Sequence, residues 1–336
     1  MISATLAKVE AANSCAGCGA CAALATEKFK LEISADGFHR PRQSAALTAE
    51  EEQAFAAVCP GRGMTQPRAE VDDRPFWGPV AGLWKGAARD ESLRRNASSG
   101  GVLSALLIHL LRSRAVKFVV QTEADDVAPY ANRTRGSADA RSVFEAAGSR
   151  YAPSSPLAGI EKHLARGEPF AFVGKPCDVA ALRAMAERDS RIKHLVPYMI
   201  SFFCAGVPSL KGAEAVLARM GCRPDEIAQF RYRGDGWPGK ATAVLKDGTF
   251  RSLTYEQSWG DILSKHLQFR CKICPDGTGG AADVVCADAW ECDERGYPLF
   301  EERDGVSLVL ARTRRGAALV AAAEAAGAIE IRPARV

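Results

Sequence analysis

The cysteines are the residues of this chain whose spacing points most directly to chemistry. A group near the start comprises Cys15, Cys18, Cys21 and Cys59. The first three cysteines are separated by two residues each, and each gap lets the backbone turn back toward a common centre. Gly17 and Gly19 supply the backbone freedom for these turns. A fourth thiolate from a remote Cys-Pro is typical of bacterial ferredoxin sites. The pattern predicts a 4Fe–4S cluster, with a zinc site or buried free thiols as the alternatives.

A second hook, Cys271-Lys-Ile-Cys274, lies far along the chain. Two other cysteines each follow a predicted strand: Cys177 comes after residues 170–174, and Cys204 comes after residues 198–203. The carboxyl ends of parallel strands lie along one edge of a sheet, where ligands bind. We therefore expect these four thiolates to converge and to hold a second cluster.

The hook has a competing pair of partners. Cys286 and Cys292 are close to it in sequence and, together with it, could make a zinc knuckle. We favour Cys177 and Cys204 on strand-end geometry alone. Cys222 follows a predicted helix, and we expect it to pack as a small hydrophobe.

A candidate anion site precedes an apolar-periodic helix over residues 103–111. Its residues are Ser98, Ser99, Gly100 and Gly101. Either serine is a natural N-cap, and the glycines let a ligand approach the backbone amides of a helix start that binds phosphate or pyrophosphate. A plain capped core helix is the alternative. No G-x-G-x-x-G and no Walker loop occurs, so neither an ordinary Rossmann site nor a P-loop ATPase is supported.

Two glycine-rich turns carry groups suited to a flat, anionic cofactor. Residues 148–151 contain Arg150 and Tyr151, and residues 234–239 contain Trp237. A guanidinium pairs with an anion and aromatic rings stack on a planar one, although both stretches are also ordinary turns.

Lys175 and His266 are the candidate catalytic residues. Lys175 stands two residues before Cys177, where a cation raises a cluster potential or holds a cofactor phosphate; a solvated loop lysine is the alternative. The histidines show no paired spacing, and His266, five residues before Cys271, is the candidate proton carrier.

The order of the predicted elements indicates an α/β fold. From Val80 onward, short apolar runs alternate with helical patterns. Strands are expected at 116–121, 170–174 and 198–203, helices at 103–111, 180–188 and 213–220, and a final β-α-β unit at 307–311, 316–326 and 329–331. A hairpin at 241–245 and 250–253 adds antiparallel pairing, so we predict a mixed, partly parallel sheet flanked by helices.

Three segments are predicted along the chain. Residues 1–67 form a small ferredoxin-like iron–sulfur module with a strand at 29–33 and a helix start at 48–52. Residues 68–79 form a linker rich in proline and charge, and residues 80–336 form the α/β domain. The chain stops at Val336 just after a predicted strand, which suggests that further residues follow.

Composition excludes several classes of protein. The chain of 336 residues is 47% apolar and 25% charged, as in an ordinary soluble globule. A net charge of +4 is too weak to indicate nucleic-acid binding. No leader pattern opens the chain, and the longest apolar runs, 102–111 and 195–207, are too short to span a bilayer. We predict a cytoplasmic protein, in which clustered cysteines bind metal more often than they form disulfides.

An ordered set of motifs resembles the coenzyme F420 hydrogenase/dehydrogenase beta subunit family. The similarity runs from about Trp77 to Trp290, and many relatives also carry the N-terminal cysteine module. The motifs are Ser98-Ser99-Gly100-Gly101-Val102, Gly148-Ser149-Arg150-Tyr151, Gly174-Lys175-Pro176-Cys177-Asp178-Val179-Ala180-Ala181-Leu182-Arg183, Cys204-Ala205-Gly206-Val207-Pro208-Ser209, Tyr232-Arg233-Gly234-Asp235-Gly236-Trp237-Pro238-Gly239, Arg270-Cys271-Lys272-Ile273-Cys274-Pro275-Asp276, Ala282-Asp283 and Asp288-Ala289-Trp290.

The resemblance implies an iron–sulfur flavoprotein oxidoreductase. Family members bind FAD and pass electrons between it, 4Fe–4S clusters and a second redox partner, which is coenzyme F420 in some; similar proteins reduce chlorophyll intermediates with ferredoxin. Two clusters and one FAD are expected here, with Cys177, Cys204, Cys271 and Cys274 as core cluster ligands. Residues 98–101 and 150–151 look like parts of the FAD site. Cys286 departs from the small non-thiol residue common at this position.

Several functional hypotheses stay open at this point. The expected partners are a ferredoxin-like or deazaflavin electron carrier, a small-molecule substrate and a partner redox subunit. One alternative is an electron-transfer subunit with no substrate of its own. Another is a ferredoxin-dependent reductase of a tetrapyrrole or other biosynthetic intermediate, and a third is a zinc-stabilised binding module.

Overall fold

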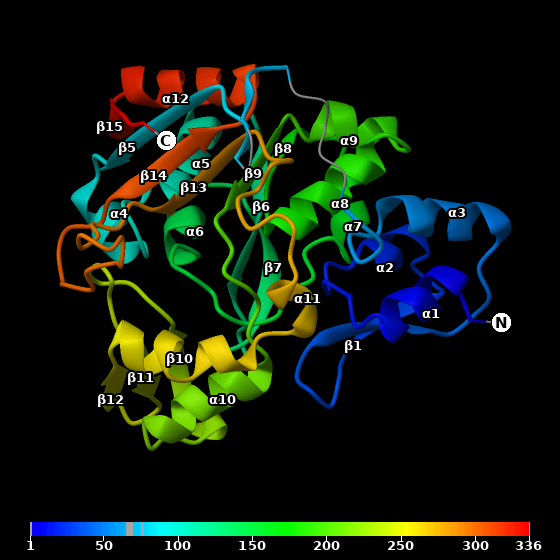
Figure 1. Ribbon diagram of the computed structural model, residues 1–336, viewed down its shortest axis with the longest axis horizontal. Helices are drawn as coiled ribbons and strands as arrows, with labels where there is room; N and C mark the ends of the chain where they lie inside the picture. Colours follow the sequence, from blue (N-terminus) through cyan, green and yellow to red (C-terminus); the bar gives the residue numbers. More distant parts are fainter. Residues whose placement is uncertain (1, 65–69, 75–76, 336) are drawn as a thin grey trace.

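The centre of the fold is an eight-stranded mixed sheet in the order β15-β5-β14-β13-β9-β8-β6-β7 (Figure 1). The computed structural model describes residues 2–64, 70–74 and 77–335. The strands are β5 (Gly82–Ala88), β6 (Phe118–Ala124), β7 (Asn132–Ser137), β8 (Phe170–Val173), β9 (Tyr198–Phe202), β13 (Val284–Asp288), β14 (Ser307–Ala311) and β15 (Ile329–Pro333). Strands β13, β9, β8 and β6 pair in parallel, and the outer pairs are antiparallel. The predicted mixed, partly parallel sheet is confirmed.

Helices cover both faces of this sheet because its central strands are apolar on both sides. Along β8, Phe170 and Phe172 pack into one core, and Ala171 and Val173 pack into the other. The first core is shared with α8 (Pro176–Ala186) and α9 (Ser190–Leu195), and the second with α5 (Val102–Arg112) and α12 (Arg314–Ala325). Shorter helices are α4 (Glu91–Asn96), α6 (Ala140–Glu145) and α7 (Ile160–Leu164).

The predicted hairpin forms, but in a different sheet from the one expected. Strands β11 (Ala241–Leu245) and β12 (Phe250–Leu253) pair antiparallel, and β10 (Ile227–Arg231) completes a separate three-stranded sheet. This small sheet packs with α10 (Leu210–Arg219) around its own core and lies below the large sheet in Figure 1. The antiparallel pairs of the large sheet come instead from β5, β7, β14 and β15. This region is completed by the short 3-10 helices η1 (Pro224–Glu226) and η3 (Leu263–His266), the π-helix η2 (Glu256–Gly260) and the helix α11 (Phe269–Lys272).

The cysteine-rich N-terminal segment lies to one side of the large sheet (Figure 1). It consists of α1 (Ala4–Ala11), α2 (Ala20–Leu24), β1 (Phe29–Ile33), β2 (His39–Gln43) and α3 (Ala49–Val58). Thr48 and Glu51 form a capping box that starts α3 where the sequence predicts a helix start. Of the predicted linker, residues 68–69 and 75–76 lie outside the described residues, and β3 (Asp73–Arg74) pairs with β4 (Gly78–Pro79). The domain boundaries stay a prediction.

Helix α8 begins four residues earlier than the apolar pattern predicts. Pro176 occupies its first position, and the Asp178 carboxylate accepts a hydrogen bond from the Lys175 backbone N–H at 3.0 Å. Cys177 therefore lies in the first turn of a helix. The final β-α-β unit also differs from the simplest expectation, since β5 lies between β14 and β15. None of the helices in the described part of the chain has both the length and the apolar character needed to cross a bilayer.

One buried carboxylate ties the centre of the sheet to its helices. Asp283, 3% exposed, accepts hydrogen bonds from the Met199 backbone N–H at 2.9 Å and from Arg183 at 2.8 Å. Its other oxygen accepts from the Thr313 hydroxyl at 2.9 Å, just before α12. These contacts join β9, α8 and α12 at the start of β13.

We predict that Asp283→Ala lowers the free energy of unfolding by about 3 kcal/mol, because the substitution removes the ion pair with Arg183 and leaves the Met199 N–H and the Thr313 hydroxyl without their acceptor. Urea denaturation followed by circular dichroism measures this. The control is Glu187→Ala, which removes the exposed ion pair with Lys193 and should leave the midpoint unchanged. Equal midpoints for the two variants would contradict the prediction.

Candidate functional site

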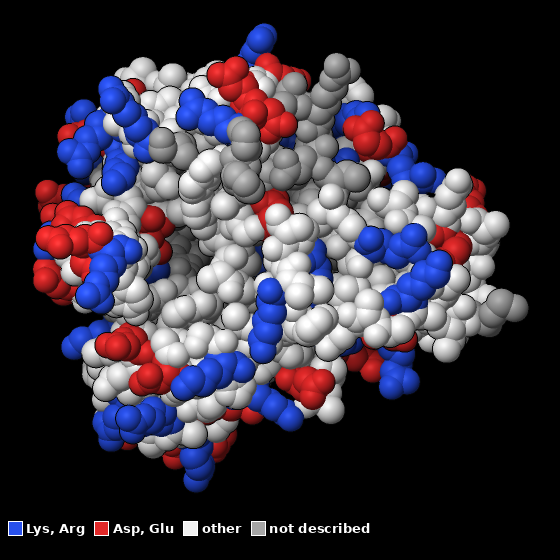
Figure 2. All heavy atoms as spheres, in the orientation of Figure 1, with Lys and Arg blue, Asp and Glu red and all other residues white. Residues whose placement is uncertain are grey.

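A cavity of about 580 Å³ opens at the carboxyl ends of β8, β9 and β13. Its volume is that of a small-molecule site. The start of α5, the turn after α6 and the aromatic residues of the small-sheet region complete its wall. Figure 2 shows this face of the molecule hollowed between the large and small sheets. The cavity thus lies at the sheet edge where the sequence predicts ligand binding.

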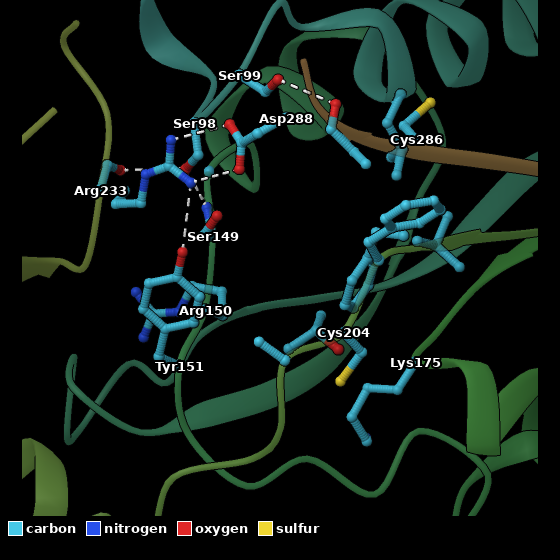
Figure 3. Close-up of a pocket in the computed structure, with 18 of the residues that line it drawn as sticks. Ser98, Ser99, Ser149, Arg150, Tyr151, Lys175, Cys204, Arg233, Cys286 and Asp288 are labelled. Carbon is cyan, nitrogen blue, oxygen red and sulfur yellow. Dashed lines mark hydrogen bonds and ion pairs between the residues drawn. The ribbon is translucent and has the colours of Figure 1, made fainter. Parts of the chain in front are cut away.

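One end of the cavity is built around a buried arginine. The Arg233 guanidinium, 1% exposed, pairs with both oxygens of Asp288 at 2.9 and 3.0 Å. It also donates to the Tyr151 hydroxyl at 3.4 Å (Figure 3). A further bond goes from its Nε to the carbonyl of Pro238 at 2.7 Å. Burial alone lowers the pKa of Arg233, but Tyr151 and Asp288 raise it above its ordinary value. The arginine is a fixed, charged part of the wall.

Aromatic rings surround this arginine. Its guanidinium lies over the rings of Tyr255 and Trp290, at 4.9 and 5.3 Å from their centroids. Both rings line the cavity. Trp237 stands behind Trp290, stacked at 4.6 Å with an interplanar angle of 9°, and donates a hydrogen bond to Asp288 at 2.7 Å. Trp237 does not line the cavity itself, so its role is to hold Trp290 and Asp288 in place.

The predicted N-cap of α5 is wrong. The helix begins at Val102, and the N-cap is Gly101 at φ 75° with no side-chain cap. Ser98 instead accepts a hydrogen bond from the Ser149 backbone N–H and joins α5 to the turn after α6. Ser99 donates to the carbonyl of Val306 at 3.1 Å. Because the serines are used elsewhere, the first turn of α5 faces the cavity without a side-chain cap.

The glycines of this loop serve packing as well as the cavity. A Cβ atom on Gly100 would lie 2.6 Å from the Gly86 carbonyl oxygen and the Ser307 nitrogen. The loop lies so close to the backbones of β5 and β14 that position 100 has room only for a glycine. Ser98, Ser99 and Gly101 line the cavity.

Arg150 lines the cavity but gives most of its donors to the protein. Its side chain donates to Asn132 at 2.9 Å and to the carbonyls of Phe230 at 3.0 Å, Pro129 at 2.6 Å and Ala131 at 2.7 Å. Burial lowers its pKa. Arg150 braces the loop that presents Tyr151, whose ring also lines the cavity.

The opposite end of the cavity holds a buried ion pair. Lys175, 6% exposed, donates to Asp178 at 2.7 Å and to the hydroxyl and carbonyl of Ser154 at 2.8 and 3.2 Å. Burial would lower the pKa of Lys175, but Asp178 and the neighbouring thiols raise it above its ordinary value. The second oxygen of Asp178 is buried without a hydrogen-bond partner. Figure 3 shows Lys175 beside Cys204 at this end.

The structure brings the first cysteine set together. Burial raises the pKa of the Cys18 thiol well above its ordinary value, and interaction with Cys59 and Cys21 adds to this. Burial and the interactions with Cys15 and Cys59 raise the pKa of Cys21 to about 12. Backbone N–H groups of Gly17, Ala20 and Gly61 bond to the sulfurs of Cys15, Cys18 and Cys59, respectively. Raised pKa values keep these thiols neutral in the metal-free chain, and a bound metal centre would be needed to ionise them.

The second set converges at the ends of β8 and β9, which are parallel neighbours. Cys177 interacts electrostatically with Cys204 and Cys271, and Cys204 interacts with Cys271 and Cys274. Burial raises the pKa of Cys177 well above its ordinary value and that of Cys204 to about 11. The backbone N–H of Val207 donates to the Cys271 sulfur at 3.3 Å. This set also fits a cluster, and Cys204 lines the cavity.

The remaining cysteines, Cys222, Cys286 and Cys292, belong to neither set. Cys286 is buried in β13 and lines the cavity, and burial alone raises its pKa to about 12. Cys292 is exposed. Cys222 packs in the core of the small sheet. Within residues 2–64, 70–74 and 77–335, no three Cys, His, Asp or Glu side chains meet closely enough to hold a single metal ion.

The structure does not bring His266 to the cavity. It lies at the end of η3, where its side chain packs against Gly212 of α10. Three residues that shape the cavity were absent from the predicted set: Arg233, Asp288 and Trp290. Each belongs to one of the motifs on which the family resemblance rests, and that is the signal that could have found them.

Two family models match the chain, and both describe the "Coenzyme F420 hydrogenase/dehydrogenase, beta subunit". The model of its N-terminal part matches residues 83–161. The model of its C-terminal part matches residues 167–336, which is about half of the chain. Together they cover almost all of the large-sheet and small-sheet regions.

Curated relatives are similar at lower coverage. The F420-dependent formate dehydrogenase subunit beta of Methanocaldococcus jannaschii is 27% identical over 232 residues, which are 65% of this chain and 59% of that protein. The F420-dependent formate dehydrogenase 1 subunit beta of Methanococcus maripaludis is 24% identical over 234 residues, 65% of this chain and 58% of that protein. The chain therefore matches these relatives over less than two thirds of their length.

A solved structure shares the fold. A chain of the F420-reducing NiFe hydrogenase complex from Methanosarcina barkeri superposes with a TM-score of 0.62 and is 18% identical. The similarity covers 78% of this chain and 85% of that one.

We predict that iron loading changes the alkylation of Cys274 and leaves that of Cys292 unchanged. Both thiols are exposed, so iodoacetamide at pH 8 should modify both in metal-free protein. Of these two thiols, a bound cluster should protect Cys274 and leave Cys292 reactive. Cys286 should react slowly in either form because of its raised pKa. Peptide mass spectrometry reads all three, and protection of Cys292 by iron would favour the competing set of ligands.

Proposed function

Because the chain belongs to the coenzyme F420 hydrogenase/dehydrogenase beta subunit family, we propose that it is an iron–sulfur flavoprotein subunit. It passes electrons between a bound FAD, two 4Fe–4S clusters and a second redox partner. Coenzyme F420 is the first candidate partner, since the curated relatives are named for its use. We assign Cys15, Cys18, Cys21 and Cys59 to one cluster, and Cys177, Cys204, Cys271 and Cys274 to the other.

The observation that carries this proposal is the position of Cys204. It belongs to the second cysteine set and also lines the cavity. A cluster held there and a ring system in the cavity are then direct neighbours, as electron transfer between them requires. Nothing in this arrangement needs a membrane or a nucleic acid.

The two ends of the cavity supply different chemistry. The uncapped first turn of α5 suits the negative groups of a dinucleotide cofactor, and the buried Arg233–Asp288 ion pair fixes the cavity wall beside it. The rings of Tyr151, Tyr255 and Trp290 offer faces on which a planar ring stacks. A bound flavin supplies the junction between two-electron hydride transfer and one-electron transfer. The chain's own residues orient it, exclude water and set the local charge.

Lys175 acts in this scheme through its charge. All three of its hydrogen-bond partners are protein oxygens of Ser154 and Asp178, so the ammonium is held by the chain itself. A buried positive charge near Cys177 and Cys204 stabilises an added electron on the neighbouring cluster. Of the two roles expected for Lys175, raising the cluster potential is therefore favoured over binding a cofactor phosphate.

A second candidate function follows from the comparisons. The curated relatives are subunits by name, which favours an electron-transfer subunit that works with a catalytic partner. Turnover of coenzyme F420 by the isolated chain with a chemical reductant would show that it has a substrate of its own. Failure to turn over despite full cofactor content would favour the relay.

We predict about eight iron atoms and one FAD per chain after anaerobic reconstitution, the content of two 4Fe–4S clusters and one flavin. Cys271→Ser should remove one cluster signal from the EPR spectrum of the reduced protein and leave the other. The matched control, Cys222→Ser, changes a packed cysteine outside both sets and should keep both signals. Zinc in a colourless protein, or unchanged spectra in Cys271→Ser, would contradict the assignment.

We predict that Lys175→Gln makes the reduction potential of the second cluster more negative, because glutamine keeps hydrogen bonding near Ser154 but removes the buried positive charge. A redox titration followed by EPR measures the shift. Lys272→Gln removes an exposed charge beside Cys271, where water screens it, and should shift the potential less. If Lys175→Gln instead weakens flavin binding at an unchanged potential, the lysine holds the cofactor.

A further inference from the structure

A short segment of chain, residues 154–158, links the first cysteine set to Lys175, which stands two residues before Cys177. From one side, the Ser155 hydroxyl donates to the Gly17 carbonyl at 2.7 Å, and the Leu157 backbone N–H donates to the Cys18 carbonyl at 3.1 Å. From the other side, Ser154 accepts two hydrogen bonds from Lys175. Since Lys175 stands two residues before Cys177, the segment connects a cysteine of each set through two hydrogen-bonded steps.

The fit of this segment against the first set is close. Gly19 has φ 90°, and a Cβ atom on it would lie 2.5 Å from the Ala158 nitrogen. Leu157 is fully buried in the same core as Cys18 and Val58. The N-terminal module and the large-sheet region thus share apolar packing as well as hydrogen bonds at this point.

A second contact between the two parts lies beside the remaining cysteines. Arg270, 6% exposed, donates to the Pro60 carbonyl at 3.3 Å. Pro60 follows Cys59 directly, and Arg270 precedes Cys271. This second contact is made on both sides by residues adjacent to cysteines of the two sets.

We propose that residues 154–158, together with Arg270, dock the N-terminal module as a fixed part of the electron path. The alternative is a tethered arm that leaves the α/β domain to meet its partner. With a cluster bound by each cysteine set, one electron would pass from the reduced cluster to the oxidised one, and the docked segment would hold the two at a fixed separation. No bond forms or breaks. The electron path rests on the proposed function, whereas the docking does not.

Hydrogen exchange of the metal-free full chain tests the docking. Ser155→Ala removes the hydrogen bond to Gly17 from outside the module, and amides of residues 14–24 should exchange about fivefold faster, the factor for one neutral hydrogen bond. Gly19→Ala should speed exchange in both 14–24 and 154–160 by forcing the surfaces apart. Ser113→Ala removes a similar hydroxyl–carbonyl bond at the end of α5 and should change neither segment.

Spin–spin interaction between the two reduced centres tests the electron path. The EPR spectrum of the loaded protein should show this interaction, and Gly19→Ala should weaken it, while Ser113→Ala keeps it. If Ser155→Ala and Gly19→Ala exchange amides of residues 14–24 and 154–160 no faster than Ser113→Ala does, the docking proposal is wrong. Protected exchange without any spin interaction would overturn the electron path. If the reconstituted protein binds no iron, the proposed function is wrong. The docking is still tested, because the hydrogen-exchange experiment uses the metal-free chain.

Discussion

The arrangement of the candidate site depends on the parallel pairing of β8 with β9. Val173 lies opposite Ile200, so the two strands end at the same edge and deliver Cys177 and Cys204 to one place. Burial of these strands on both faces leaves that edge as the open side of the sheet. The cavity, the buried Lys175 and the hook at Cys271 all gather there. A different register between β8 and β9, or a different strand order, would separate Cys177 from Cys204 and remove the cavity at their ends.

Desolvation sets the electrostatic character of this edge. Burial raises the pKa values of the clustered thiols, and the only buried ammonium at the cavity end, within the residues described, is that of Lys175. Backbone N–H groups bonded to sulfur add partial positive charge without a side chain. Burial by itself keeps these thiols neutral, whereas the backbone N–H groups and Lys175 favour the thiolates that a bound metal centre requires.

At the charged end of the cavity, hydrogen-bond partners determine the role of each arginine found in a sequence motif. Arg150 has the expected side chain for an anion, yet its donors are used to hold its own loop. Arg233 is also hydrogen-bonded, but its bonds to Asp288 hold it in the cavity wall among aromatic rings. Both arginines line the cavity, and in both cases hydrogen bonds to the protein fix the guanidinium group.

Local pattern predicted many of the elements and indicated the chemistry of the cysteines: two-residue spacing defines a hook, and apolar runs define strands, because both depend on neighbours along the chain. The same is true of the α/β class and of the family motifs. Tertiary packing decided the rest. The hairpin at 241–253 joined a second sheet, Gly101 replaced the serines as N-cap, and His266 turned away from the cavity, because each outcome depends on contacts with segments remote in sequence. The contact between the two cysteine sets is of this kind, since residues 154–158 meet Gly17 and Lys175 only in the folded chain.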